Sequence, residues 1–254
     1  MDTIFLRPSG IISYLRCPRA HFFGYIESAP RLVSAALAIG SAFHKATEVL
    51  VAALKAHRRP IEVIAEAEAT LEESLALEQT LGDADPDDDR FDTAKDVAVG
   101  LLRAAAQAIP ETWEPDIVEE TAVLPLTDDI SIRGTTDLVL KDGTIIDFKT
   151  RARKTSIGEI RRDQQFTAYA MIRNHADGKV DRPRNLTIVE VTKTKVPAVH
   201  LQPTIRTAED FAVYSKIATN VATAIRAGLD HPSPNIFCSC CSFRHLCDAF
   251  RRVA

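Results

Sequence analysis

The sequence feature that most constrains the fold is the stretch GTTDLVLKDGTIIDFK, residues 134–149. Two runs rich in Val, Ile, Leu and Thr flank Asp142-Gly143, which predicts a β-hairpin. A two-residue loop would put Asp137 and Asp147 on opposite faces of that hairpin. A three-residue loop with Gly143 in the left-handed conformation would pair the two aspartates directly, with Lys149 on the same side. We predict the second register, because adjacent carboxylates weaken a strand pair unless a cation binds between them.

The elements around this hairpin predict an α/β fold. A helix capped by Ser9 is expected at 11–27, divided at Pro18, and others at 34–57, 61–80 and 93–108, with no strand before residue 117. Strands are expected at 117–126, 130–140, 144–148, 186–192 and 198–201, and later helices at 157–174, 207–228 and 243–252. We predict a central mixed β-sheet of four or five strands flanked by helices.

The length of 254 residues is compatible with a single domain, residues 1–254. Within it, residues 1–110 would form an N-terminal helical part, residues 111–205 the sheet-containing core, and residues 206–254 a C-terminal helix followed by a cysteine-rich segment.

Charge and hydropathy narrow the class of protein. The net charge of -4 hides two regions of opposite charge. Residues 62–96 carry 13 acids and 2 bases, whereas residues 149–195 carry 12 bases and 5 acids. A basic face is therefore compatible with the acidic total. The longest uncharged apolar run, residues 32–43, is too short to cross a bilayer, and the N-terminus has no apolar signal core. We expect a cytoplasmic protein with no membrane partner. No phosphate loop of the GxxxxGK[ST] type is present, which predicts no ATP motor.

Five cysteines are distributed very unevenly. Cys17 lies near the start, whereas Cys238, Cys240, Cys241 and Cys247 lie within ten residues. In a reducing compartment this clustering favours a metal or iron–sulfur site over disulfides. Four thiolates suit either tetrahedral Zn²⁺ or a [4Fe–4S] cluster.

The hairpin aspartates suggest a site for Mg²⁺ or Mn²⁺ that activates water for phosphodiester hydrolysis. Asp137 and Asp147 would be the bridging ligands, the Phe148 carbonyl would add an oxygen, and Lys149 would orient the water. His44, on the helix at 34–57, would complete the ligand set. Taken singly, an acid-x-lysine strand is more often a solvated face, and a lone histidine on an Ala-rich helix is more often packed.

The joint order of these residues resembles the PD-(D/E)XK nuclease superfamily, in its RecB-like branch. The matching motifs are Gly40-x3-His44, Gly134-x2-Asp137, Asp147-x-Lys149 and Gln165-x3-Tyr169. The CRISPR-associated RecB-like exonucleases also carry an early Cys-Pro-Arg and three late cysteines, which are similar here to Cys17-Pro18-Arg19 and Cys238-x2-Cys241-x5-Cys247.

The resemblance implies a restriction-endonuclease-like core and a set of roles. His44, Asp137 and Asp147 would hold Mg²⁺ or Mn²⁺, Lys149 would be catalytic, and Gln165 and Tyr169 would steady the site and the substrate strand. A [4Fe–4S] cluster, in preference to Zn²⁺, would tie the N-terminal helical lobe to the C-terminus through four cysteines: Cys17, Cys238, Cys241 and Cys247. Cys240 is one more than the usual three late cysteines and leaves a second quartet open.

We therefore expect a metal-dependent DNA exonuclease that acts on single-stranded DNA or DNA ends. Its process would be recombination, repair or CRISPR-type DNA processing, and its protein partner would be a separate helicase or a recombination or CRISPR protein. A basic track would bind the strand: Arg151, Arg153, Lys154, Arg161, Arg162, Lys193 and Lys195. The alternatives are a non-catalytic DNA-binding or recombination scaffold built on the cysteine site, and a nuclease acting on RNA.

Overall fold

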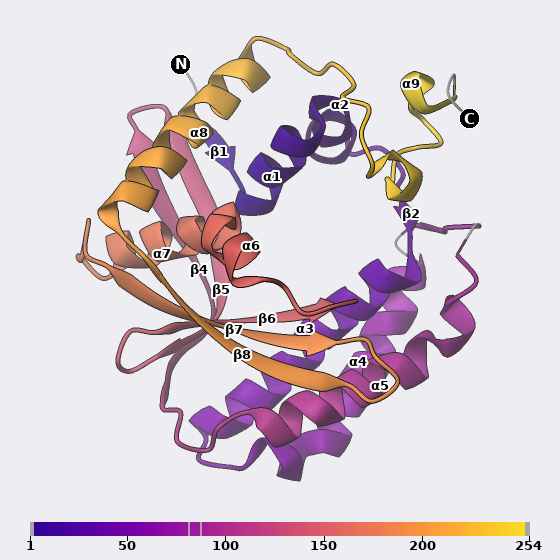
Figure 1. Cartoon of the computed structure of the whole chain (residues 1–254), viewed down its shortest axis with the longest axis vertical. Coiled ribbons are helices and arrows are strands. Elements are labelled where there is room, and N and C mark those ends of the chain that lie inside the picture. The colour runs from indigo at the N-terminus through magenta and orange to yellow at the C-terminus, as the bar shows by residue number, and fades with distance from the viewer. Residues whose placement is uncertain (1–2, 81, 87, 252–254) are drawn as a thin grey trace.

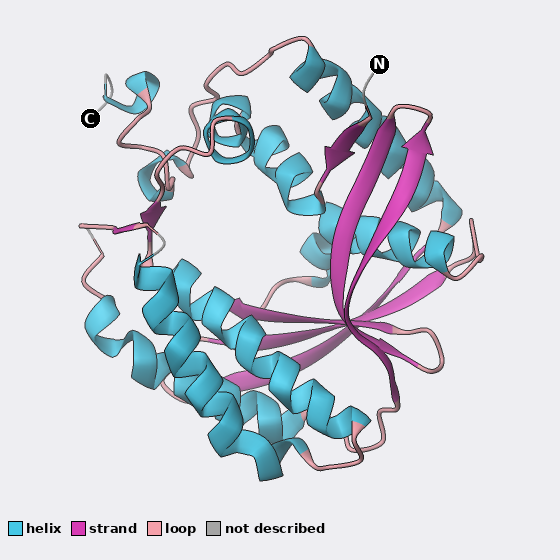
Figure 2. Cartoon of the chain, turned by 180° about the vertical axis from the view of Figure 1, so that it is seen from behind, coloured by secondary structure: helices cyan, strands magenta, loops and turns pink. Residues whose placement is uncertain are grey.

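The computed structural model describes residues 3–80, 82–86 and 88–251 as two groups of helices joined by a twisted sheet (Figures 1 and 2). The helices are α1 (Pro8–Arg16), α2 (Pro18–His21), the π-helix η1 (Phe22–Ile26), α3 (Ala35–Lys55), the 3₁₀-helix η2 (Pro60–Val63), α4 (Ile64–Thr80), α5 (Phe91–Ala108), α6 (Ile157–Arg162), α7 (Gln164–Ala176), α8 (Ala208–Arg226), the 3₁₀-helix η3 (Cys238–Cys240) and α9 (Asp248–Arg251). The strands are β1 (Ile4–Leu6), β2 (Leu32–Val33), β3 (Asp83–Ala84), β4 (Pro115–Thr127), β5 (Ile130–Leu140), β6 (Ile145–Arg151), β7 (Arg184–Thr192) and β8 (Ala198–Arg206).

The main sheet is mixed and has six strands in the order β1-β5-β6-β7-β8, with β4 paired to β5. β1 runs parallel to β5 and β6 runs parallel to β7, while the other neighbours are antiparallel. Helices α3 to α5 form one hydrophobic core against the sheet, and α1, α7 and α8 form another. The predicted α/β class with a central mixed sheet flanked by helices is confirmed.

Helix α3 is the central helix of the larger core. Its N-cap Ser34 accepts a hydrogen bond from the Leu37 N–H, and eleven of its residues are buried. By length and mean hydropathy (1.3) α3 could cross a membrane, but 56% of the tested window is buried inside the protein. A core helix of a globular protein passes the same test, so this finding is weak evidence for a membrane span.

The prediction of no strand before residue 117 is wrong. β1 pairs with the beginning of β5, and the short strands β2 and β3 form a parallel pair of their own. Such strands of two or three residues are stabilised by distant partners, and their own sequences carry too little alternation to reveal them.

The predicted helix at 157–174 is two helices that meet at Asp163. Ser156 begins α6 with a capping box to Glu159, and Asp163 caps α7 by accepting from the Gln165 N–H at 2.8 Å. The side chain of Arg206, 1% exposed, donates to the Ile160 carbonyl at 2.6 Å. The junction is therefore held by a cap on one side and a buried guanidinium on the other.

Two other boundaries differ from expectation. β8 continues to Arg206, five residues beyond the predicted end, because it pairs along its whole length with β7. The predicted last helix, 243–252, is confined to α9 (Asp248–Arg251), and residue 252 lies outside the described residues.

The hairpin between β5 and β6 adopts the predicted three-residue loop. Gly143 has φ +87° and its N–H bonds the Leu140 carbonyl at 2.8 Å, while the Leu140 N–H bonds the Thr144 carbonyl at 2.9 Å. Leu138 pairs with Ile146, and the same register carried one residue further sets Asp137 opposite Asp147. The register prediction is confirmed.

One edge of β5 is open in its middle. On that edge β5 pairs with β1 through residues 130–132 and with β6 through residues 138–139. Among the residues that the structure describes, no strand pairs with residues 133–137 on that edge. The strand also turns sharply in this region. Ile132 packs with α7 and α8, whereas Leu138 packs with the α3–α5 core. The split in the sheet creates room for side chains beside Asp137.

Candidate active site

The candidate active site lies at this open edge, where α3 crosses the sheet. His44 of α3 approaches Asp137 of β5, with 3.4 Å between Nδ1 and Oδ2. The same carboxylate oxygen accepts a hydrogen bond from the Phe148 N–H of β6 at 2.9 Å. The Asp137 side chain thus takes the place of a neighbouring strand's carbonyl at the point where β5 and β6 separate.

Asp147 and Lys149 lie on the same face of β6, two residues apart. The Lys149 ammonium donates to Oδ1 of Asp147 at 2.9 Å and lies 2.8 Å from Oδ2. Asp147 is 1% exposed and the Lys149 side chain 13%, so the carboxylate is removed from water and the ammonium is largely so. Buried ion pairs of this kind carry a large desolvation cost, which is more typical of functional sites than of stabilising ones.

The two aspartates have opposite pKa shifts. Burial raises the pKa of Asp147 to about 6; Lys149 and His44 offset only part of that rise, and neighbouring Asp137 adds to it. Burial also acts to raise the pKa of Asp137, but His44, Lys149 and the Phe148 N–H together hold it below its ordinary value. Two carboxylates in one pocket with their pKa values pushed apart are a common sign of an acid–base or metal site.

The two aspartates also shift the pKa values of His44 and Lys149. Burial acts to lower the pKa of His44 and of Lys149, but in both cases the carboxylates prevail and the pKa is raised. Lys149 is therefore a protonated ammonium at neutral pH, able to hold a developing negative charge.

Gln165 and Tyr169 lie one turn apart on α7. The Gln165 amide donates to the Tyr169 hydroxyl at 2.7 Å. Tyr169 is buried, and burial together with Asp147 and Asp137 holds its pKa well above the ordinary value. The structure thus brings His44, both aspartates, Lys149 and Tyr169 into one electrostatic neighbourhood, although the roles of these residues stay predictions.

Glu119 of β4 also belongs to this neighbourhood, and sequence reasoning missed it. Val118 pairs with Leu138 and Glu120 with Thr136, so Glu119 lies opposite Asp137 in the ladder. Its backbone is left-handed, with φ +49°. Burial, Asp137 and Glu48 raise the pKa of Glu119 to about 7. The only sequence signal was the pair Glu119-Glu120, which interrupts the alternation of an otherwise apolar strand.

The donor types suit a hard divalent ion, because carboxylates and an imidazole gather at one edge. Among residues 3–80, 82–86 and 88–251, however, no three His, Cys, Asp or Glu side chains stand ready to hold a single ion. The Asp137 carboxylate already pairs with His44 and accepts a hydrogen bond from the Phe148 N–H, and the Asp147 carboxylate already pairs with Lys149. The assignment of His44, Asp137, Asp147 and Phe148 as metal ligands therefore stays a prediction.

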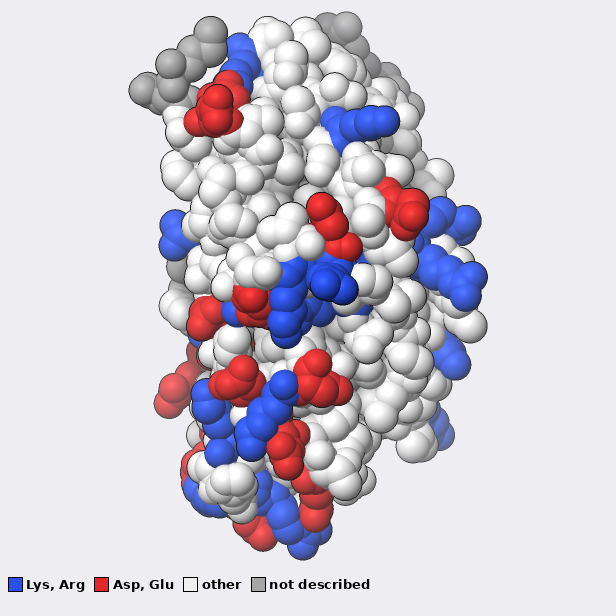
Figure 3. Space-filling view, turned by 90° about the vertical axis from the view of Figure 1, so that its left-hand side faces the viewer, with Lys and Arg blue, Asp and Glu red and all other residues white. Residues whose placement is uncertain are grey.

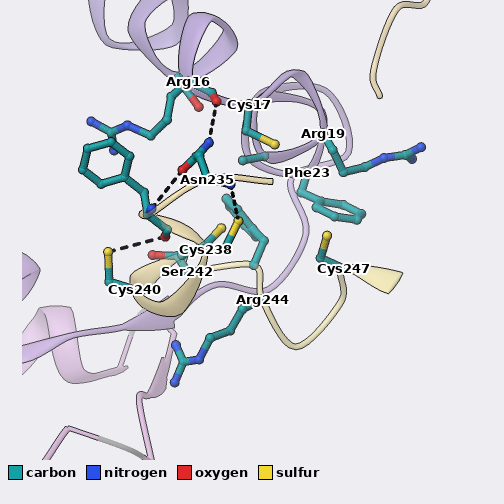
Figure 4. A pocket seen from close by; sticks show the side chains of 15 residues that line it. Arg16, Cys17, Arg19, Phe23, Asn235, Cys238, Cys240, Ser242, Arg244 and Cys247 are labelled. Atoms are coloured by element: carbon teal, nitrogen blue, oxygen red, sulfur yellow. Dashed lines mark hydrogen bonds between the residues drawn. The ribbon is translucent and has the colours of Figure 1, made fainter. Parts of the chain in front are cut away.

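The cysteine segment forms a second site, a cavity of about 220 Å³ between α1–α2 and the C-terminal turn. All five cysteines line it. The sulfurs of Cys17, Cys238 and Cys247 face a common space, while Cys240 is turned away toward the Phe237 carbonyl (Figure 4). Burial raises the pKa of Cys241, and Cys17, Cys238 and Cys247 are close enough to add to that rise.

Backbone contacts hold two of these sulfurs. The Ser233 N–H lies 3.4 Å from the sulfur of Cys17, and the Asn235 N–H lies 3.3 Å from the sulfur of Cys238. The Asn235 amide also donates to the Arg16 carbonyl at 3.0 Å. The C-terminal segment is thus fastened directly to the end of α1.

Some of the basic residues between 149 and 195 are paired with acids, while the track predicted from Arg151 to Lys195 stays a prediction. Arg173 and Arg184 are buried and both pair with Asp177, and Arg153 pairs with Glu159. On the side of the molecule that carries α7 and α8, acidic and basic side chains are interspersed (Figure 3).

Comparison with known proteins agrees with this fold. The "Putative exonuclease" of Eubacterium rectale has a similar structure, with a TM-score of 0.56 and 14% sequence identity over 98% of this chain and 88% of that one. The solved structure named SSO0001 matches with the same identity and coverage but a TM-score of 0.41. No curated protein matched the chain.

At 14% identity the first of these likenesses shows the fold alone, and it agrees with a restriction-endonuclease-like core. The sequence model of one family covers nearly the whole chain, from residue 6 to residue 248. The protein therefore belongs to the PD-(D/E)XK nuclease superfamily.

Proposed function

We propose that this protein is a metal-dependent exonuclease that hydrolyses phosphodiester bonds in single-stranded DNA or at DNA ends. The observation that carries the proposal is the buried Asp147–Lys149 pair beside Asp137 and His44, at the open edge of β5. Nucleases of this superfamily generally use divalent metal ions, which supply a water of lowered pKa and charge stabilisation.

The side chains divide the work by their chemistry. His44, Asp137, Asp147 and the Phe148 carbonyl would hold Mg²⁺ or Mn²⁺. The Lys149 ammonium, whose pKa is raised by Asp147 and Asp137, would orient the water and stabilise negative charge on the phosphate. Gln165 would hold the Tyr169 hydroxyl in place beside the carboxylates.

The test is digestion of 5′- and 3′-labelled single- and double-stranded DNA with Mg²⁺ or Mn²⁺, with EDTA as the control. Asp137→Asn and Lys149→Gln are expected to lower kcat by at least about 100-fold with retained circular dichroism. The matched controls are Asp142→Asn and Lys141→Gln, in the turn of the same hairpin, and these are expected to keep full activity. Full activity of either active-site variant would contradict the proposal.

Two alternatives are outcomes of the same experiment. Preferential digestion of an RNA oligonucleotide would indicate a ribonuclease. DNA binding without hydrolysis under any metal would favour a non-catalytic scaffold. The biological process, in recombination, repair or CRISPR-type processing, and a separate helicase or recombination partner remain predictions from the family resemblance.

We further propose that Cys17, Cys238, Cys241 and Cys247 hold a [4Fe–4S] cluster. The cavity of about 220 Å³ has room for much more than one ion, since a water molecule occupies about 30 Å³. Hydrogen bonds from backbone N–H groups to cysteine sulfur are also typical of iron–sulfur sites. The cluster would be structural, because it would join residue 17 to the last part of the chain.

Anaerobic purification tests the cluster. We expect brown protein with about four irons and four acid-labile sulfides per chain, lost in Cys17→Ser. Cys240→Ser is the matched control and is expected to keep the colour, because its sulfur is turned away. Stoichiometric zinc without iron would identify the other occupant.

A further inference from the structure

A small polar pocket lies at the same open edge of β5 as the aspartates, on the side of β1. It has a volume of about 290 Å³ and forms where the start of α1, strands β4 and β5, and helix α7 meet. Its polar lining is Arg7, Ser9, Thr121, Arg133, Thr135 and Tyr169. The proposed catalytic roles use only the last of these residues.

The two arginines of this pocket differ from the arginines of the nearby ionic clusters. Arg173 and Arg184 are buried and paired with carboxylates. Arg7 and Arg133 are exposed, and within the described residues neither guanidinium has an acidic partner. Two positive charges from different elements therefore face one pocket with no carboxylate among its lining residues.

The chemistry of the pocket matches a phosphate diester. A guanidinium presents parallel N–H donors that fit two phosphate oxygens. Hydroxyl groups of Ser, Thr and Tyr are common additional donors to backbone phosphates. Thr121 and Thr135 already share a hydrogen bond of 2.7 Å, which fixes their hydroxyls beside the pocket.

Tyr169 connects the pocket to the aspartates. Its ring lies against Gly134, where an added Cβ would be 3.4 Å from Cε1 of the ring and 2.9 Å from Cδ1 of Ile172. A larger residue than glycine would require the end of the Ile172 side chain to shift. At its other end the tyrosine hydroxyl is bonded to Gln165 and feels the charge of both aspartates.

The distance along the strand suits a nucleic-acid backbone. Arg133 precedes Asp137 by four residues, which is at most about 13 Å along a strand that turns here. At about 3.4 Å or more per nucleotide, this spans roughly two to four nucleotides. Both positions lie within the unpaired stretch 133–137, so a bound strand can follow the edge without displacing a β-strand.

We propose that Arg7 and Arg133 form a phosphate-binding subsite that holds the substrate strand a few nucleotides away from the bond that is cut. This inference rests on the proposed nuclease function, and it assigns a binding role to residues outside the family motifs. The subsite positions the backbone and does not read the bases, because its donors match phosphate oxygens.

The experiment measures binding without hydrolysis. A fluorescent ten-nucleotide oligothymidylate is titrated in EDTA at several salt concentrations. The double variant Arg7→Gln/Arg133→Gln is expected to bind the oligonucleotide at least about 10-fold more weakly. The slope of the logarithm of the binding constant against the logarithm of the salt concentration should also become about 1.4 less steep, which is about 0.7 for each lost phosphate contact. The control Lys179→Gln/Arg182→Gln removes the same charge from the exposed turn before β7 and is expected to leave both values unchanged.

A second measurement locates the phosphate. Single neutral methylphosphonates are placed along the same oligonucleotide, and one position should weaken binding to the wild-type protein but not to the double variant. Two results would overturn the subsite. One is that the two double variants have equal salt slopes. The other is that every methylphosphonate weakens binding equally for the wild-type protein and for Arg7→Gln/Arg133→Gln. Because no hydrolysis is needed, the result stands apart from the digestion assay, in which failure of the wild-type protein would overturn the nuclease proposal.

Discussion

At the scale of single residues, Asp147 and Lys149 illustrate why a site can be costly to stability. Asp147 is 1% exposed, and the Lys149 ammonium lies 2.8 Å from one of its carboxylate oxygens. Burial of the carboxylate leaves little access for water to replace that partner. A charge thus occupies a position where a neutral residue would be more stable.

We predict that Lys149→Met lowers the free energy of unfolding by about 3 kcal/mol, because it leaves a buried carboxylate without its cation. The double variant Asp147→Asn/Lys149→Met should recover most of this loss. Urea denaturation followed by circular dichroism measures both. Lys141→Met, which breaks the exposed pair with Glu114, should change stability by no more than about 0.5 kcal/mol. Equal effects of the two lysine substitutions would contradict the prediction.

Glu119 makes a pH-dependent contribution. Its pKa is about 7 in the folded protein and near 4.5 in the unfolded chain, so the folded state holds the proton more tightly. The resulting stabilisation is complete below about pH 4.5 and is lost as the pH rises to about 7. Because Glu119 is only half-buried, solvent reduces the effect.

Glu119→Gln is therefore expected to raise the free energy of unfolding by about 1 kcal/mol at pH 8 and by clearly less at pH 5. Urea denaturation at the two pH values measures the difference. Glu120→Gln alters a neighbouring exposed carboxylate that pairs with Arg173, and this substitution should not raise the free energy of unfolding more at pH 8 than at pH 5. A Glu119→Gln effect that is constant or larger at pH 5 would show that the carboxylate is not desolvated.

At the scale of elements, Arg184 holds the hairpin of the candidate site to α7 and β7. Its guanidinium donates to the Gly143 carbonyl at 2.7 Å and to the Asn174 amide oxygen at 2.8 Å, and it pairs with Asp177. One side chain at the start of β7 thus contacts the turn between β5 and β6 as well as the end of α7.

We predict that Arg184→Met lowers the free energy of unfolding by about 3 to 5 kcal/mol, because it leaves the Asp177 carboxylate and the Gly143 carbonyl short of a donor. Amide hydrogen exchange should increase at the hairpin turn, residues 141–145, and at the end of α7. Arg182→Met, two residues earlier and exposed, is the control and should leave exchange unchanged. Normal protection of the turn in Arg184→Met would contradict this role.

At the scale of the whole molecule, helices α1 and α2 meet the C-terminal segment around the cysteine cavity (Figure 1). The Tyr14 hydroxyl donates to the Leu229 carbonyl at 2.7 Å, and the Leu32 N–H bonds the Ser242 carbonyl at 2.8 Å. Arg244 forms an ion pair with Asp85, which connects the cysteine segment to the loop after β3. The C-terminal segment therefore contacts both α1 and the α3–α5 block.

If the proposed cluster is present, Cys17→Ser should increase hydrogen exchange in α1 and in residues 235–247 together, because one cross-link would hold both. Cys240→Ser should change neither region. Loosening of the C-terminal segment alone would indicate that the hydrogen bonds and the Arg244–Asp85 pair suffice to hold α1.

The sequence by itself determined the hairpin register and most helix positions, because those signals are local. Gly143 can adopt φ +87° at low cost, and Asp142-Gly143 between apolar runs leaves few alternative loops. Periodic apolar positions also predicted α3 to within two residues at each end.

Tertiary structure decided everything that depends on a distant partner. Three residues of β1 become a strand only because β5 is there to pair with them, and the left-handed backbone of Glu119 accompanies the sharp turn of the sheet. The pocket of Arg7 and Arg133 joins residues more than a hundred positions apart. No local pattern encodes such neighbours, since pairing and burial depend on where the rest of the chain has folded.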